Sequence, residues 1–150
     1  MKMNSFPLHI CLFTLVAFLA FSCNPDKQEK IDQMLIEEYL EENNLEAEST
    51  PSGLHYIITV AGNNEHPTLD DVIQISYTGR LLNGSIFDSS PYSSFPLDML
   101  IEGWQEGIPY LGKGGEGIFI IPSHLGYGAS ALQGIPANSV LVFDIRLIDF

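Results

Sequence analysis

Basic residues are scarce in this 150-residue sequence. It has six Lys and Arg against 19 Asp and Glu, which gives a formal net charge of -13 at pH 7. Such a surface repels nucleic acid and anionic lipid headgroups, so we expect no nucleic-acid partner. The rest of the composition, 45% hydrophobic and 17% charged, is typical of one globular domain with a hydrophobic core.

The side-chain patterns of most reaction classes are also missing. No GxSxG or phosphate-loop motif is present, and the glycine-rich GKGGEG at 112–117 is interpreted as a turn. The histidines have no metal-ligand spacing. We therefore expect neither a metal nor a cofactor. The four histidines are His9, His55, His66 and His124.

Long hydrophobic runs are absent except near the start of the chain. The run from Ile10 to Phe21 has 12 residues, which suits a signal sequence and is shorter than the ~20 needed to span a bilayer. It ends LAFSC, which resembles the lipobox of bacterial lipoproteins, although Ala20 stands where leucine is usual. Residues 1–22 are predicted to be a lipoprotein signal peptide. The alternative is an ordinary secretory signal cut near Ser22.

Cysteine is nearly absent. Cys11 lies inside the predicted signal, so Cys23 is the only thiol of the exported chain and no internal disulfide can form. Lipid attachment at Cys23 explains this unpaired thiol. We expect a membrane-anchored protein of the cell envelope, and the sequence leaves open which face of the membrane it occupies.

Residues 23–50 are predicted to form a tether and an acidic amphipathic helix. Nine acidic residues and two lysines lie between positions 26 and 48. Helical spacing extends over 31–44. Its apolar side is expected to pack on its own domain, or alternatively on a second copy as a homodimer. Ile31, Leu35 and Tyr39 form the predicted contact row, flanked by Met34, Ile36 and Leu40.

Beyond a hinge-like segment at 48–53 the pattern is mainly β. Strands are predicted at 54–60, 72–80, 117–121 and 140–150, and Asn83-Gly84 is a strong turn signal. In the last strand, Leu141, Phe143, Ile145 and Leu147 alternate with Asp144 and Arg146, so the first four should face the core.

One short helix is predicted at 98–109. Asp98 can cap it and Pro109 should end it. Gly103 and Gly107 each cost about 1 kcal/mol relative to alanine. Such a helix needs support from the sheet, and Trp104 is the side chain expected to pack against it.

Aromatic residues occur where a core does not require them. Phe87, Phe95 and Tyr127 are expected in turns or loops, next to Asp88, Pro96 and Gly128. Because loops lie on the surface, aromatic side chains there favour a concave apolar pocket over a simple core.

Four motifs, in order, carry a family resemblance. YTGRLLNGSIFDSS, IEGWQEG, IPSHLGYG and GIPANSVLVFDIRL resemble the FKBP-type peptidyl-prolyl cis-trans isomerases. The resemblance covers residues 51–150. It implies an α+β fold in which an antiparallel β-sheet wraps around one short α-helix, with the ligand pocket between them.

The resemblance also implies the site. Trp104 is the pocket floor, the Tyr127 hydroxyl bonds the ligand, and Asp88 orients Tyr77 or faces the twisting carbonyl, although Asp88 could instead cap a turn at Ser89 and Ser90. Asp88, Tyr127 and Trp104 are the implied catalytic residues. The implied substrate-binding residues are Tyr77, Phe87, Phe95, Leu100, Ile101, Ile135 and Phe143.

The implied activity is rotation of Xaa-Pro peptide bonds during the folding of exported proteins, with proline-containing polypeptides as partners and macrolides as inhibitors. The sequence departs from the family at Leu97, at Pro91-Tyr92 and in a shorter loop before Ile135. These departures concern peptide preference and macrolide affinity. They also leave open a non-catalytic proline-peptide-binding module or chaperone that uses the same groove.

Overall fold

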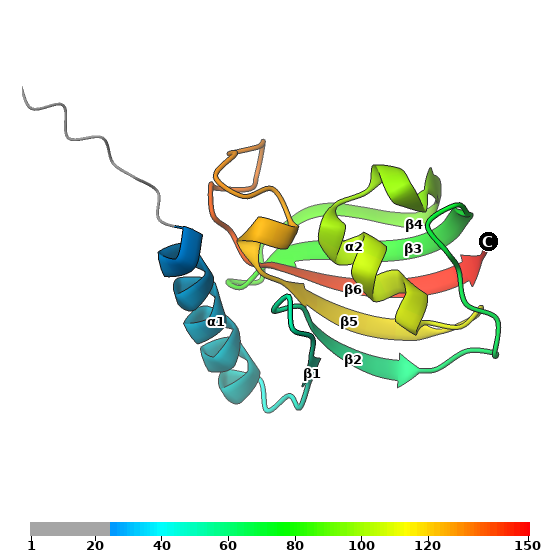
Figure 1. Cartoon of the computed structure of the whole chain (residues 1–150), viewed down its shortest axis with the longest axis horizontal. Helices are drawn as coiled ribbons and strands as arrows, with labels where there is room; N and C mark the ends of the chain where they lie inside the picture. Colours follow the sequence, from blue (N-terminus) through cyan, green and yellow to red (C-terminus); the bar gives the residue numbers. More distant parts are fainter. Residues whose placement is uncertain (1–24) are drawn as a thin grey trace, which may run out of the picture.

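The computed structural model describes residues 25–150, so the predicted signal peptide and the lipid attachment at Cys23 lie outside the described residues. The fold is α+β. One six-stranded antiparallel sheet has the strand order β1-β2-β5-β6-β3-β4, and the short helix α2 lies over one of its faces (Figure 1). In this part of the chain, no helix is long and apolar enough to cross a membrane. The strands are β1 (Glu48–Ser49), β2 (His55–Val60), β3 (Val72–Leu81), β4 (Ile86–Pro96), β5 (Glu116–Ile121) and β6 (Leu141–Asp149); the helices are α1 (Pro25–Glu42), α2 (Glu102–Gly107) and three 3-10 turns, η1 (Leu97–Met99), η2 (Ile108–Tyr110) and η3 (Ser123–Leu125).

The core lies between α2 and the inner face of the sheet. The alternation predicted for β6 is confirmed: its odd-numbered side chains from Leu141 to Leu147 are buried, while Asp144 and Arg146 are on the opposite face. In β3, Ile73 and Ile75 are also fully buried. The predicted turn at Asn83-Gly84 is confirmed as well, and Gly84 adopts the positive φ of 84° that such a turn requires.

The full extent of the edge strand β4 was not predicted from the sequence. It pairs with β3 from Val72↔Pro96 to Arg80↔Ile86, with two shifts of register. The expectation that Phe87 and Phe95 lie in turns or loops is therefore wrong, because both belong to this strand. The segment at 48–53 also differs from a free hinge, since Glu48 and Ser49 pair with β2.

The predicted helix at 98–109 is divided into three pieces. Asp98 lies in η1 and makes no side-chain cap, because α2 begins after Ile101, which is its N-terminal cap residue. Pro109 follows the end of α2, within η2. Trp104 is 5% exposed, which confirms that it packs between α2 and the sheet.

The two glycines of α2 allow this short helix to lie close to the sheet. A Cβ atom on Gly103 would be 2.5 Å from Cγ2 of Ile121, and one on Gly107 would be 2.7 Å from Cδ1 of Phe119. Both distances are too short for a real contact. The low helix propensity of glycine is therefore offset by close packing on β5.

We predict that Gly103→Ala lowers the free energy of unfolding by about 1–3 kcal/mol, because overpacking outweighs the gain in helix propensity. Urea denaturation measures the change. In an Ile121→Ala background the clash is gone, so the same substitution should stabilise the protein. Stabilisation by Gly103→Ala in the wild-type background would contradict this packing.

The N-terminal helix α1 packs on the outer face of the sheet. Ile36 is fully buried there against Ile120, Val140 and Val142. This confirms packing on its own domain, but the predicted contact row is only partly right: Tyr39 packs against this cluster, whereas Ile31 and Leu35 are 39% and 37% exposed. The contacts come instead from the side of the helix that carries Asp32 and Ile36, with Tyr39 and Leu40 beside them.

Candidate active site

A small aromatic cavity of about 210 Å³ lies between the inner face of the sheet and α2. It brings together nine of the ten residues that the sequence implicated in binding or catalysis. They come from β3, β4, the segment before α2, α2, the loop after η3, and β6. The lining residues are Tyr77, Phe87, Asp88, Phe95, Leu100, Ile101, Trp104, Tyr127 and Phe143.

Trp104 is held at the bottom of this cavity by other aromatic rings. Its ring centroid lies 5.0 Å from that of Phe143 and 5.2 Å from that of Tyr77, with interplanar angles of 81° and 79°. These edge-to-face contacts fix the orientation of the indole. Its buried Nε1 has no hydrogen-bond partner among the described residues. The faces of the indole and of the rings around it give the cavity a largely apolar floor, while this N–H remains a polar group unpaired within residues 25–150.

Gly79 is a site residue that the sequence reasoning missed. In the sheet it lies between Asp88 of β4 and Phe143 of β6. A Cβ atom here would be 2.6 Å from a ring carbon of Phe143 and 2.7 Å from two ring carbons of Phe87. The two rings pack edge to face over the glycine, with their centroids 5.5 Å apart. The glycine in YTGR was the available signal, because a glycine inside a strand often marks a close approach.

Asp88 accepts a hydrogen bond from the Tyr77 hydroxyl at 2.7 Å. It lies within β4, and within the described chain Ser89 and Ser90 make no hydrogen bond to it, so the turn-cap alternative is wrong. Burial, together with the Asp88 bond, raises the pKa of Tyr77 to about 12. Burial, and then the charge of Asp88, also raises the pKa of Tyr127. Both phenols therefore remain protonated donors at neutral pH.

The Tyr77 pKa predicts a dependence of stability on pH. An unfolded tyrosine has a pKa of about 10, so the folded state binds the phenolic proton more tightly. This contribution to stability is complete below pH ~10 and is lost as the pH rises to about 12. The free energy of unfolding should fall less steeply over that window in Tyr77→Phe than in the wild type, as measured by urea denaturation. Tyr92→Phe is the control for the loss of one phenol. If the free energy of unfolding falls with pH equally steeply in Tyr77→Phe and in the wild type, the raised pKa of Tyr77 is contradicted.

The segment before α2 presents a free backbone donor. Gln105 Nε2 donates to the carbonyl oxygens of Leu100 at 2.6 Å and Asp98 at 3.1 Å, which fixes this turn. The Ile101 carbonyl accepts the N–H of Trp104. Among the described residues, the N–H of Ile101 itself has no protein acceptor. This donor therefore remains available beside the cavity.

Ile135 is the one implicated residue that does not line the cavity. It is 6% exposed, belongs to the core, and forms a bridge with Leu132 in the loop. The neighbouring Gly134 lies near Phe87, so this loop lies beside one wall of the cavity. Leu97, one of the departures from the family pattern, is also fully buried away from the cavity.

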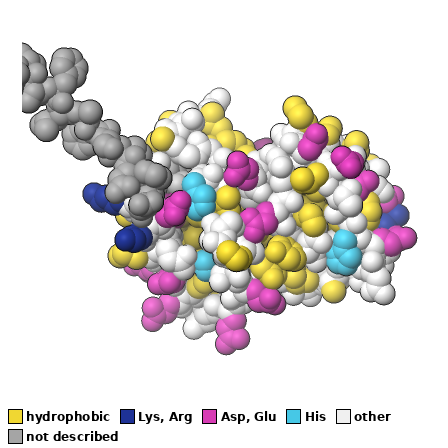
Figure 2. Space-filling view, in the orientation of Figure 1, with side chains coloured by type: hydrophobic (Ala, Val, Ile, Leu, Met, Phe, Trp, Pro, Cys, Tyr) yellow, Lys and Arg dark blue, Asp and Glu magenta, His cyan; other side chains and the backbone are white. Residues whose placement is uncertain are grey.

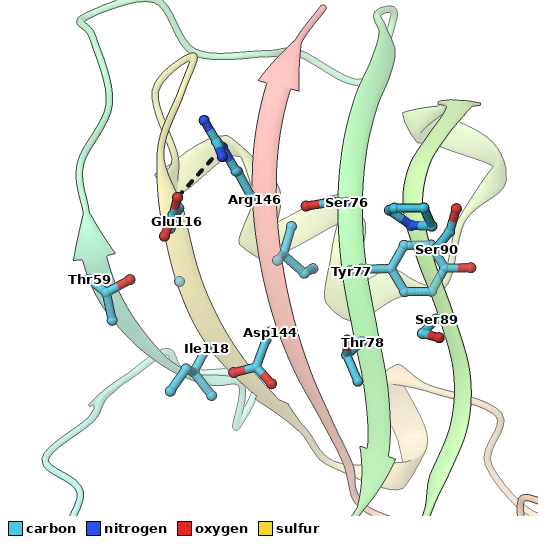
Figure 3. Close-up of a pocket in the computed structure, with 13 residues that line it drawn as sticks. Thr59, Ser76, Tyr77, Thr78, Ser89, Ser90, Glu116, Ile118, Asp144 and Arg146 are labelled. Atoms are coloured by element: carbon cyan, nitrogen blue, oxygen red, sulfur yellow. Dashed lines mark ion pairs between the residues drawn. The ribbon is translucent and has the colours of Figure 1, made fainter.

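A larger, shallow groove of about 610 Å³ lies on the outer face of the sheet (Figure 3). Its side chains come from β2 to β6, and α2 lies behind the sheet in this view. The groove is lined by hydroxyl groups and by the ion pair between Arg146 and Glu116 at 3.5 Å. No group of three or more potential metal ligands occurs within residues 25–150. The smaller cavity, with its apolar floor and convergent donors, is the better candidate site.

Comparison with known proteins determines the family. Residues 63–148 match the family model described as FKBP-type peptidyl-prolyl cis-trans isomerase. The chain belongs to this family. The resemblance carried by the four sequence motifs is thus confirmed.

Curated FKBP-type relatives are similar over most of this chain. A probable FKBP-type peptidyl-prolyl cis-trans isomerase FkpA of Neisseria meningitidis is 43% identical over 119 residues, which are 75% of this chain and 44% of the relative. FkpA of Escherichia coli is 41% identical over 118 residues, 75% of this chain and 43% of the relative. The chain spans less than half the length of these relatives.

Solved FKBP-type structures share the fold. The crystal structure of FkpA from Escherichia coli gives a TM-score of 0.71 at 37% identity and covers 83% of this chain and 63% of that one. A peptidyl-prolyl cis-trans isomerase from Pseudomonas syringae gives a TM-score of 0.72 at 27% identity and covers 83% of this chain and 93% of that one. These similarities confirm the predicted arrangement of an antiparallel sheet around a short helix.

Proposed function

We propose that this protein is a peptidyl-prolyl cis-trans isomerase that acts on proline-containing polypeptides. The observation that carries this proposal is the aromatic cavity of about 210 Å³ with Trp104 as its floor. A water molecule takes about 30 Å³ in the liquid, so the cavity has the volume of several waters. That space suits a proline ring and the amide beside it.

Such a cavity accelerates rotation without forming a covalent bond. The planar Xaa-Pro amide is polar, and rotation costs roughly 18–20 kcal/mol because it breaks C–N resonance. The twisted amide has lost resonance, and its carbonyl oxygen carries less negative charge. An apolar cavity therefore disfavours the planar amide more than the twisted one, which is differential binding of the transition state.

Three polar groups orient the substrate in this proposal. The free N–H of Ile101 holds one substrate carbonyl, and the Tyr127 hydroxyl donates a second hydrogen bond. Asp88 keeps the Tyr77 hydroxyl directed along the rim through the 2.7 Å bond. None of these groups transfers a proton, so the reaction needs no general base.

A protease-coupled assay on Xaa-Pro peptides tests the activity. The wild type should accelerate the cis-to-trans step, and Asp88→Ala should lower kcat/KM about tenfold, or about 1.4 kcal/mol, by releasing Tyr77. Asp98→Ala is the matched control, because that exposed carboxylate lies outside the cavity. Titration with a macrolide should inhibit the wild type if the altered rim still admits that ligand. A wild-type rate equal to the uncatalysed rate would contradict the proposal.

The alternative is a proline-peptide-binding module or chaperone that uses the same groove without catalysis. The departures at Pro91 and Tyr92 support it, because both are exposed on the edge strand β4, which also carries Phe87 and Asp88 of the cavity. Suppression of aggregation of an unfolded protein, with no change in Xaa-Pro exchange, would favour this alternative.

We also propose export and lipid anchoring in the cell envelope. The proposal divides the chain into a signal peptide (1–22), a tether and helix (23–50) and an isomerase domain (51–150), and it is supported by the LAFSC sequence around Cys23. Metabolic labelling with a palmitate analogue should mark the wild type and leave Cys23→Ser unmarked. Equal labelling of both, or of neither, would contradict anchoring at this residue.

A homodimer through residues 31–44 is supported by the outward side of α1. Ile31, Met34 and Leu35 are exposed there and line a groove of about 430 Å³ with Glu37, Glu38 and Glu41. Lys and Arg side chains lie at the start of α1, and Asp and Glu side chains further along (Figure 2). Two antiparallel copies would place the lysines of each helix beside the glutamates of the other.

Light scattering tests the dimer. The wild type should have the mass of two chains, and Met34→Glu should have the mass of one. Gln33→Glu adds the same charge at a half-buried position outside this groove and should leave the mass unchanged. A monomeric wild type at all concentrations would contradict the dimer.

A further inference from the structure

A buried carboxylate joins the N-terminal helix to the turn that precedes Tyr127. Asp32 of α1 is 0% exposed. Its Oδ2 accepts the N–H of Ser123 at 2.8 Å and the Ser123 hydroxyl at 2.6 Å, and its Oδ1 accepts Gln28 Nε2 at 2.7 Å. Figure 1 shows η3, which begins at Ser123, near α1. Hydrogen bonds to a carboxylate are stronger than neutral ones, so this link is well suited to fix Ser123.

Ser123 in turn holds the backbone on both sides of Tyr127. Its carbonyl oxygen accepts the N–H of Gly126 at 3.0 Å and the N–H of Gly128 at 2.8 Å. The carbonyl of Gly128 accepts the N–H of Asn138 at 2.7 Å, which joins the two ends of this loop. A continuous series of hydrogen bonds therefore leads from the Asp32 carboxylate to the residues that flank Tyr127.

Tyr127 needs such support because its own segment is weakly constrained. It has a glycine on each side and is 36% exposed, yet its side chain lines the cavity. Gly128 adopts a positive φ of 56°, and nothing lies within 4 Å of the position where a Cβ would be. The carbonyl of Tyr127 accepts the N–H of Ser130 at 3.1 Å within the same loop, so the bonds to the Ser123 carbonyl are the ones that tie this tyrosine's backbone to η3 and, through Ser123, to α1.

We propose that Asp32 is a positioning residue of the isomerase site. It fixes Ser123, and through Ser123 it fixes the point at which the Tyr127 hydroxyl enters the cavity. The inference rests on the proposed isomerase function. It makes α1 part of the catalytic unit, in addition to any role as a spacer between the membrane anchor and the domain. The competing explanation is that Asp32 only attaches α1 to the sheet.

The test compares Asp32→Ala with Asp32→Asn in the full chain. Asparagine keeps an acceptor oxygen for Ser123, so Asp32→Asn should retain kcat within about threefold of the wild type. Asp32→Ala should lower kcat on a Leu-Pro peptide about tenfold with little change in KM, because the Tyr127 hydrogen bond serves the transition state. Amide hydrogen exchange should become faster at Gly126, Gly128 and Asn138 and remain unchanged in β3 and β6.

Ile36→Ala is the matched control. It loosens α1 on the sheet and leaves the Asp32–Ser123 bonds in place, so kcat and loop exchange should stay near wild type. The proposal is overturned if Asp32→Ala leaves kcat and loop exchange unchanged, if exchange rises equally throughout the sheet, or if Ile36→Ala gives the same loop effects.

A second variant covers the case in which Asp32→Ala does not fold. Ser123→Ala removes only the hydroxyl donor, and it should lower kcat about threefold with faster exchange at Gly128. Wild-type kcat and exchange in Ser123→Ala would then overturn the proposal. An inactive wild type would instead contradict the proposed function. The link from Asp32 to the loop would still be tested by the hydrogen-exchange pattern. It would also be tested by peptide binding, measured through Trp104 fluorescence.

Discussion

Trp104→Ala is expected to lower kcat/KM on Xaa-Pro peptides about 100-fold, which corresponds to about 2.7 kcal/mol of transition-state stabilisation. The indole forms the floor of the cavity and is held edge-on by Phe143 and Tyr77. Its removal leaves a water-accessible hole where the proline ring should rest. The planar amide is then solvated again, and the advantage of the twisted amide is lost. The protease-coupled assay measures this change.

Stability has to be separated from catalysis in this experiment. Truncation of a buried tryptophan typically costs about 3–5 kcal/mol, so part of the population could unfold. Trp104→Phe keeps an apolar ring on the floor and should lose only about tenfold in kcat/KM. Phe119→Leu destabilises the same core without touching the cavity, and its kcat/KM should match the wild type. Wild-type activity of folded Trp104→Ala would contradict the role of the indole.

Gly79→Ala is expected to have the second-largest effect, a loss of about 10- to 30-fold in kcat/KM. The new methyl group would lie 2.6 Å from Phe143 and 2.7 Å from Phe87, so both rings must move. They form the wall of the cavity, and their displacement changes the space left for proline. Overpacking should also lower the free energy of unfolding by about 1–3 kcal/mol, as measured in urea.

Gly117→Ala is the matched control for this substitution. Gly117 also lies inside a strand, and a Cβ there would be 2.9 Å from the Ile57 carbonyl oxygen. It should cost a similar amount of stability but leave kcat/KM unchanged, because the atoms that a Cβ would meet there belong to residues outside the cavity, whereas a Cβ on Gly79 meets two of its lining rings. In a Phe87→Leu background, Gly79→Ala should lose less activity. Equal kinetic effects of the two glycine substitutions would contradict a specific role for Gly79.

The fold could be predicted where the sequence alternates. Strand β6 carries a strict inner and outer pattern from Leu141 to Leu147, and it occupies the predicted position. Seven of the nine residues that line the cavity belong to the four motifs, which is why the lining could be predicted; Phe95 and Leu100 lie between the motifs. Phe87, Trp104 and Tyr127 indeed meet around one cavity, although they are far apart in the chain.

The remaining features depend on contacts that a local pattern does not contain. Strand β4 includes SSPYSSFP, which is rich in serine and proline and lacks alternation, and it is ordered by pairing with β3. The orientation of α1 was mispredicted because the helix has apolar side chains on two sides. The buried bonds of Asp32 to Ser123, 91 residues away, decide which side faces the sheet. Gly103 and Gly107 are unfavourable by helix propensity alone, and only their close contacts with β5 account for them.

NMR exchange spectroscopy on a Xaa-Pro peptide, with a small molar fraction of the protein, tests the central claim most directly. Uncatalysed cis-trans exchange takes tens to hundreds of seconds. We predict exchange cross-peaks between the cis and trans signals at mixing times of about a second, with equal rates at pH 6 and pH 9 because no proton is transferred. Peptide binding at Trp104 with exchange at the uncatalysed rate would contradict the account. A catalysed rate that follows the titration of one group would contradict a mechanism without proton transfer.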